Sequence, residues 1–335
     1  MTALIAGLDG GRILGTLLEV ALAASLWAGI SLPLAAAHLE FWSGRRGRPE
    51  DREAAARLGE VAVANLGVLA AAAAGTMLLA LVRKPDRLLP LLIWLAPVLP
   101  WAWLAGTAYA ALVLLYASDW GWRGRPPAAR TACGAAAGLL ALLLAAVRES
   151  AEAAASAPAL WPLVAENPWV IFRQPGAALF TLHHALGAGA AGGVALMLAG
   201  RGAFRWESSV PLSAGARLIR WGAACVLASS ALQILLGAAW VGSKGPAWVR
   251  ATFYGGGRPL LIGVALLVAS AIFLLEVAVS ALRRKGSAPR AGLAAAALLA
   301  AVALTAGWVR AGVEGASRPG PPKTVRAETG GRAAR

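Results

Sequence analysis

The run 176–200, GAALFTLHHALGAGAAGGVALMLAG, decides the fold class, because it is long and apolar and its only ionisable side chains are two histidines. A transmembrane helix needs about 20 consecutive apolar residues, and its backbone polar groups must bond within the helix. Similar runs recur along the chain, in which 59% of the 335 residues are hydrophobic and only 14% are charged. The sequence therefore predicts an all-α integral membrane protein.

We expect about eight transmembrane helices, at 13–39, 58–82, 88–117, 129–147, 176–200, 216–241, 259–282 and 291–309. The third run contains Pro90, Pro97 and Pro100, which predict a kinked or re-entrant start. The helices form a transmembrane domain over 1–312, and the loop 148–175 would divide it into two four-helix bundles. Gly, Pro and Arg dominate 313–335, which is expected to be a disordered basic tail.

The net charge of +15 is spread over connecting loops and the tail. It forms no continuous basic face, so nucleic acid is not an expected partner. Basic loop residues instead act as topology signals and contact anionic lipids. Lys and Arg are in excess after the first, third, fifth and seventh helices. That excess predicts that both termini lie outside the cytoplasm.

The chain has only three histidines, and two of them, His183 and His184, lie inside the run 176–200. Ionisable residues within a membrane are costly and are functional candidates. A neutral imidazole is the usual axial ligand of b-type haem, and the small residues at 187–193 could let a flat macrocycle approach. Because adjacent helical residues point about 100° apart, only one histidine can bind a given haem. We expect His184 to be this metal ligand, with His183 as the alternative. The competing interpretation is a histidine bonded to a neighbouring helix or turned towards the headgroups.

Five further residues are candidates for the same chemistry or for a separate path. Met77 is a candidate second haem ligand, although methionine in an apolar helix usually fills space. Arg173 is a candidate contact for a haem propionate or a headgroup. Glu19 and Glu276 are candidates for receiving a quinol proton, although each could be a hydrogen-bonded structural carboxyl. With Gln233, Glu276 could instead line a solute path.

Some of these motifs resemble subunit I of the cytochrome bd quinol oxidases, in the form of its divergent bd-like membrane subunits. The first helix carries LWAGISLPL at 26–34, which is similar to the family's first helix. Asn167-Pro168 followed by His184 resembles the family's Asn-Pro and its low-spin haem histidine. Gly307-Trp308 resembles the end of the family's last helix.

Other family features are missing, which limits what the resemblance implies. The family's first-helix histidine falls near Ala28, and 88–117 has no Asp or Glu to match its paired carboxylates. The resemblance therefore implies one low-spin haem b beside a quinol site, without an oxygen-reducing site.

The expected function is electron transfer between the quinone pool and a partner redox protein. That partner would be another subunit of a membrane complex, with an extracytoplasmic cytochrome c as one candidate. The expected location is the inner membrane of a bacterium, and whether the chain is itself an oxidoreductase stays open. The alternatives are a haem-free membrane scaffold of an electron-transfer complex and a small-solute transporter.

Overall fold

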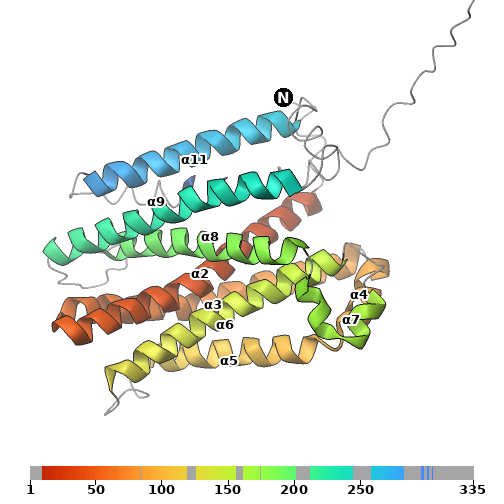
Figure 1. The fold of residues 1–335 in the computed structure, drawn as a ribbon, viewed down its shortest axis with the longest axis horizontal. Coiled ribbons are helices and arrows are strands. Elements are labelled where there is room, and N and C mark those ends of the chain that lie inside the picture. Colours follow the sequence, from red (N-terminus) through yellow and green to blue (C-terminus); the bar gives the residue numbers. More distant parts are fainter. Residues whose placement is uncertain are drawn as a thin grey trace, which may run out of the picture.

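The computed structural model describes residues 10–83, 85–118, 126–155, 161–173, 175–200, 212–243 and 258–282, with a few positions between 296 and 304. Its elements are α2 (Gly10–Arg46), α3 (Pro49–Arg83), α4 (Pro85–Leu95), α5 (Leu99–Ala117), α6 (Pro127–Ala155), α7 (Trp161–Glu166), the 3-10 helix η3 (Pro168–Arg173), α8 (Pro175–Gly200), α9 (Leu212–Ser243) and α11 (Arg258–Leu282) (Figure 1). These ranges contain no strand, and the prediction of an all-α protein is confirmed.

Within the described residues, six helices are long and apolar enough to cross a membrane: α2, α3, α5, α6, α8 and α9. The sequence had indicated about eight. The apolar part of α11, Ile262–Val277, is shorter than the other six spans, and the expected helix 291–309 lies largely outside the described residues. Large apolar side chains such as Ile93 and Trp103 are more than 70% exposed. In a membrane protein such side chains face lipid.

Two helices continue beyond their predicted ends. The apolar run of the first helix stops at 39, but α2 continues to Arg46, and Gly47 then turns the chain with a φ of 61°. Glycine adopts this left-handed conformation without steric cost. Likewise α6 passes the predicted end at 147 and continues to Ala155. Arg148 and Glu149, which were placed in a loop, are therefore helical.

The Pro-rich run 88–117 is broken, as its prolines predicted. The segment divides into α4 and α5, with a turn between Leu95 and Leu99. Proline removes a backbone donor but suits the first turn of a helix, and Pro100 lies in the first turn of α5. The short helix α7 lies beside α4 (Figure 1), and Val164 of α7 and Ile171 of η3 are buried together with Leu95 of α4.

One hydrophobic core joins helices from both sides of the 148–175 segment. Its members include Leu39 of α2, Leu58 of α3, Tyr109 of α5, Ala137 of α6, Ala188 of α8 and Leu218 of α9. The expected division into two four-helix bundles stays a prediction, because one of the eight expected helices lies largely outside the described residues. Helix α2 packs against α3, α6 and α8, and this central position brings its Trp27 against α8.

Candidate functional site

A buried hydrogen bond joins α2 to α8. The indole Nε1 of Trp27 lies 2.8 Å from Nδ1 of His184, and His184 is only 6% exposed. An indole N–H can donate but cannot accept, so Nδ1 of His184 must carry the lone pair. The neutral imidazole then carries its proton on Nε2.

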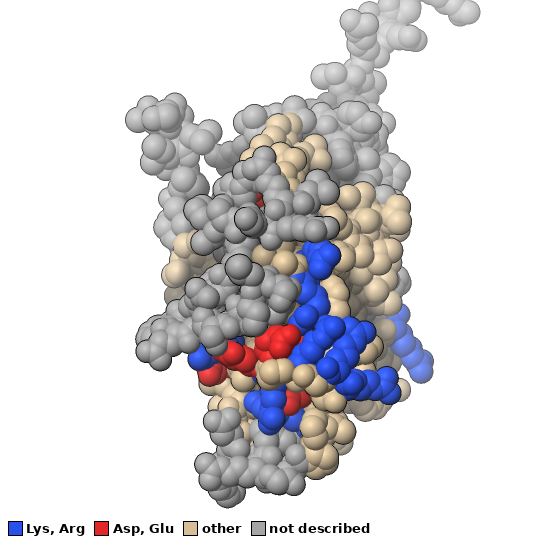
Figure 2. All heavy atoms as spheres, turned by 90° about the vertical axis from the view of Figure 1, so that its left-hand side faces the viewer, with Lys and Arg blue, Asp and Glu red and all other residues tan. Residues whose placement is uncertain are grey.

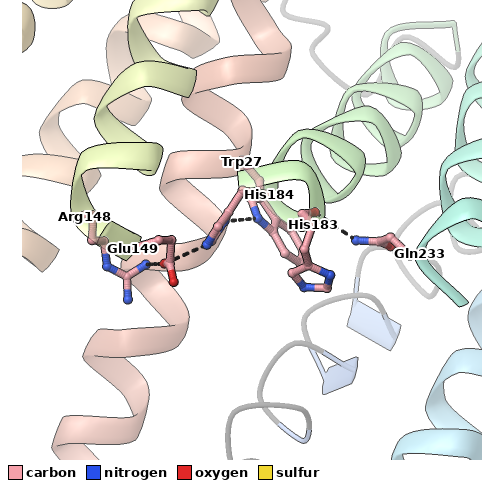
Figure 3. A network of polar contacts seen from close by, with 6 residues as sticks. All are labelled: Trp27, Arg148, Glu149, His183, His184 and Gln233. Carbon is pink, nitrogen blue, oxygen red and sulfur yellow. Dashed lines mark hydrogen bonds and ion pairs between the residues drawn. The ribbon is translucent and has the colours of Figure 1, made fainter. Parts of the chain in front are cut away.

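The second nitrogen of the same imidazole faces a carboxylate from α6. Nε2 of His184 lies 2.8 Å from Oε1 of Glu149, and Glu149 is 8% exposed. Because Nε2 carries the proton, it donates to this oxygen. Nη1 of Arg148 lies 3.3 Å from the same oxygen and supplies a positive charge. The four side chains form a polar chain across three helices (Figure 3).

A glycine of α8 makes room for Trp27, the first member of the polar chain. A Cβ added at Gly187 would lie 2.6 Å from Cζ2 of Trp27, so a larger residue there would push the indole away. Gly187 follows His184 by three positions and is therefore on nearly the same face of α8. The indole packs against α8 one turn from the imidazole that it contacts.

The polar chain lies near the end of α6 and in the first half of α8. Glu149 is six residues before the end of α6 at Ala155, and His184 is nine residues after the start of α8 at Pro175. At 1.5 Å per residue, these positions lie about 9 and 14 Å from those helix ends. Glu149 and His184 are each less than 10% exposed, so the polar groups are shielded from water.

His183 lies beside this chain and points in another direction from α8 (Figure 3). Its ring centroid is 6.1 Å from those of Trp27 and His184, both in edge-on arrangements. Nε2 of Gln233, from α9, donates to the backbone oxygen of His183 at 3.4 Å. The amide therefore ties α9 to the backbone next to the buried imidazole.

The surroundings of His184 do not fit axial haem ligation. Both of its ring nitrogens are already hydrogen bonded. The glycines expected to form a flat face contact neighbouring helices instead: Gly187 meets Trp27, Gly189 meets Ser229 and Gly192 meets Ser31. For His183, no ring hydrogen bond is found within the described part of the chain, and ligation through it stays a prediction.

The other predicted site residues lie apart from the polar chain of Trp27, His184, Glu149 and Arg148. Met77 is 44% exposed on α3, and Arg173 is exposed on η3. Glu19 precedes Trp27 by eight residues, about 12 Å along α2. Glu276, on α11, has a buried Oε2 with no hydrogen-bond partner among the described residues. In that part of the chain, none of the four is a hydrogen-bond or ring partner of His184.

Sequence reasoning missed Arg148 and Glu149 as site residues. The run 129–147 was ended at its last apolar position, which placed both side chains in a loop. That run is about 28 Å long as a helix, slightly short of the ~30 Å hydrocarbon core. A helix continued by one turn would have brought Glu149 to the membrane boundary. Trp27 was noted only for its place in a family motif.

Comparison with known proteins adds no family: no family model matches this chain, and no curated protein matches it. The geometry of the described helices is therefore the basis on which a function is proposed.

Proposed function

We propose that this chain is the quinol-oxidising membrane subunit of a redox complex, and that Glu149 accepts the quinol proton. The observation that carries this proposal is the buried polar chain, in which the side chains of Trp27, His184 and Glu149 are joined by two 2.8 Å hydrogen bonds. Ionisable residues within a membrane mark proton relays. Quinol as the substrate rests on the resemblance to bd-type subunits.

The residues divide this task according to their hydrogen bonds. Oxidation of a quinol to a quinone releases two electrons and two protons, and the electrons pass to the partner redox protein. Glu149 is the general base, and its Oε2 accepts a hydroxyl proton while His184 Nε2–H holds Oε1. Trp27 positions the imidazole, because its N–H prevents protonation of Nδ1. The proton then leaves Glu149 past Arg148, whose side chain is 31% exposed. Glu149 can then accept the second proton of the quinol.

Replacement of Glu149 by glutamine tests the proposed base. The amide oxygen of Glu149→Gln can still accept from His184 Nε2–H but cannot bind the proton. In membranes that contain the natural partners, quinol-dependent acceptor reduction should fall by roughly 100-fold or more. Glu60→Gln is the matched control, because Glu60 is exposed at the opposite end of the bundle and pairs with Arg57. A Glu149→Gln variant that turns over at the wild-type rate would contradict the proposal.

A second candidate function is proton-coupled transport of a small solute. It is favoured by Gln233, which reaches the backbone of His183, and by the buried Oε2 of Glu276. Proteoliposomes with an internal pH dye distinguish the two functions. A transporter acidifies the lumen when solute is added without any quinol, whereas a quinol-oxidising subunit does not. A haem-free scaffold gives neither solute-driven acidification nor quinol oxidation.

A further inference from the structure

Charged side chains gather at the end of the bundle opposite His184, where α2 ends and α3, α6 and α9 begin (Figure 2). Several of the arginines there are neutralised by carboxylates: Arg52 pairs with Glu40, Arg57 with Glu60, and Arg217 with both Asp51 and Glu50. Arg45 and Arg46 differ. Within the described residues, no salt bridge to either is found.

Arg45 and Arg46 are instead held on aromatic rings of the preceding turn. The guanidinium carbon of Arg45 lies 4.8 Å from the ring centroid of Phe41, and that of Arg46 lies 4.0 Å from the ring of Trp42. Positions four apart on a helix are neighbours, and the ring faces attract the cations. Both arginines are exposed, so their N–H groups remain accessible to an acceptor.

These residues lie where a headgroup layer would be. Arg46 is the last residue of α2 and lies about 10 Å beyond residue 39, where the apolar run of this helix ends. His38 of α2 stacks edge-on against Trp42 and against Trp221 of α9, with centroid distances of 6.2 and 5.3 Å. Tryptophans concentrate at the boundary between lipid tails and headgroups. The two guanidinium groups are therefore placed at the level of lipid phosphates.

We propose that Arg45 and Arg46 form a binding site for the phosphate of an anionic phospholipid such as phosphatidylglycerol. Guanidinium groups donate strong, charge-assisted hydrogen bonds to phosphate oxygens. Stacking on Phe41 and Trp42 orders the two side chains before lipid binds, which lowers the entropy lost on binding. A phosphatidylcholine headgroup brings its own cation, and the ring face of Trp42 that could receive it is occupied by Arg46. The site should therefore select anionic lipid.

Native mass spectrometry of the purified full-length chain tests this site, with phosphatidylglycerol and phosphatidylcholine added in equal amounts. The wild type should carry mainly phosphatidylglycerol. Each basic residue near an anionic lipid contributes roughly fivefold in affinity, so the double variant Arg45→Gln/Arg46→Gln should bind phosphatidylglycerol at least ~10-fold more weakly. Arg57→Gln removes one charge from the same end of the bundle and should bind like the wild type.

A variant that keeps both charges tests the aromatic support separately. Trp42→Leu removes the ring beneath Arg46 and should weaken phosphatidylglycerol binding by roughly two- to fivefold. Equal binding of both lipids by the wild type would overturn the proposal. Undiminished phosphatidylglycerol binding by the double arginine variant would do so too. If Trp42→Leu binds like the wild type, the ring does not order the site.

Discussion

Trp27 and Glu149 bind opposite nitrogens of one imidazole, each at 2.8 Å. Together they fix both the orientation and the tautomer of His184, because Trp27 can only donate and Glu149 must then accept. The histidine that composition suggested as a metal ligand is thus part of a hydrogen-bonded chain. Its partner Glu149 lies six residues before the end of α6 and beside the partly exposed Arg148.

Glu149→Ala should destabilise the protein more than Glu149→Gln does. Alanine leaves the Nε2–H of His184 buried without an acceptor, which costs roughly 1–3 kcal/mol. Glutamine offers an amide oxygen in the same place and should cost less than about 1 kcal/mol. Reversible unfolding of the purified protein in mixed micelles measures both changes. An alanine variant as stable as the wild type would show that the bond to His184 contributes nothing.

Gly222→Ala should weaken the packing of α8 on α9. A Cβ at Gly222 would overlap the carbonyl oxygen of Gly193, and one at Gly193 would overlap that of Gly222. Small residues allow such close approach between membrane helices, and overpacking costs roughly 1–3 kcal/mol.

Gly67→Ala is the control for the glycine prediction, because it makes the same chemical change at a position where, apart from the chain neighbours and the backbone of its own helix, no atom of the described residues lies within 4 Å of the new Cβ. Its unfolding free energy should equal the wild-type value or rise slightly, because alanine favours helix. If Gly222→Ala and Gly67→Ala lose the same unfolding free energy, the close contact between α8 and α9 is not the cause of the loss.

Asp51→Asn should loosen the contact between α3 and α9. The Asp51 side chain is 1% exposed and accepts a hydrogen bond from Nη2 of Arg217. Loss of a charged partner for a buried donor costs roughly 1.5–3 kcal/mol. The more distant carboxylate of Glu50, at 3.7 Å from the same nitrogen, makes Glu50→Gln the milder control. The same unfolding assay should show a larger loss of unfolding free energy in Asp51→Asn than in Glu50→Gln. A larger loss in Glu50→Gln would contradict the prediction.

His184→Ala should leave the haem spectrum of the protein unchanged. Both nitrogens of His184 are bonded to side chains, so any b-type band in the dithionite-reduced protein must arise from another ligand, with His183 as the remaining candidate. Reduced-minus-oxidised spectra of the wild type and the variant make the comparison. Loss of the band in His184→Ala would show that iron displaces Trp27 or Glu149.

The sequence predicted the helical runs well, but it did not predict where they end. Apolar composition marks only the part of a helix that lies in lipid. Helices α2 and α6 continue into the polar residues before Arg46 and Ala155, because hydrogen bonding along the backbone does not stop where the apolar side chains do. The error at α6 removed Glu149 from the candidate site.

The partners of His184 were beyond the reach of a single sequence. His184 was singled out because it is ionisable within an apolar run, which is a local signal. Trp27 is 157 positions away and Glu149 is 35 positions away, and their convergence depends on the packing of α2 and α6 against α8. The glycines near His184 gave an equally local signal, since glycines serve close helix packing as readily as they serve a cofactor.

Nitrogen NMR of the protein labelled with 15N-histidine tests the central claim most directly, because only three histidines contribute signals. We predict one imidazole with an unprotonated, hydrogen-bonded Nδ1 and a protonated Nε2, and Trp27→Phe should shift that Nδ1 signal alone. A His184 protonated on Nδ1, or one whose Nε2 signal shows bonding to iron, would contradict the account.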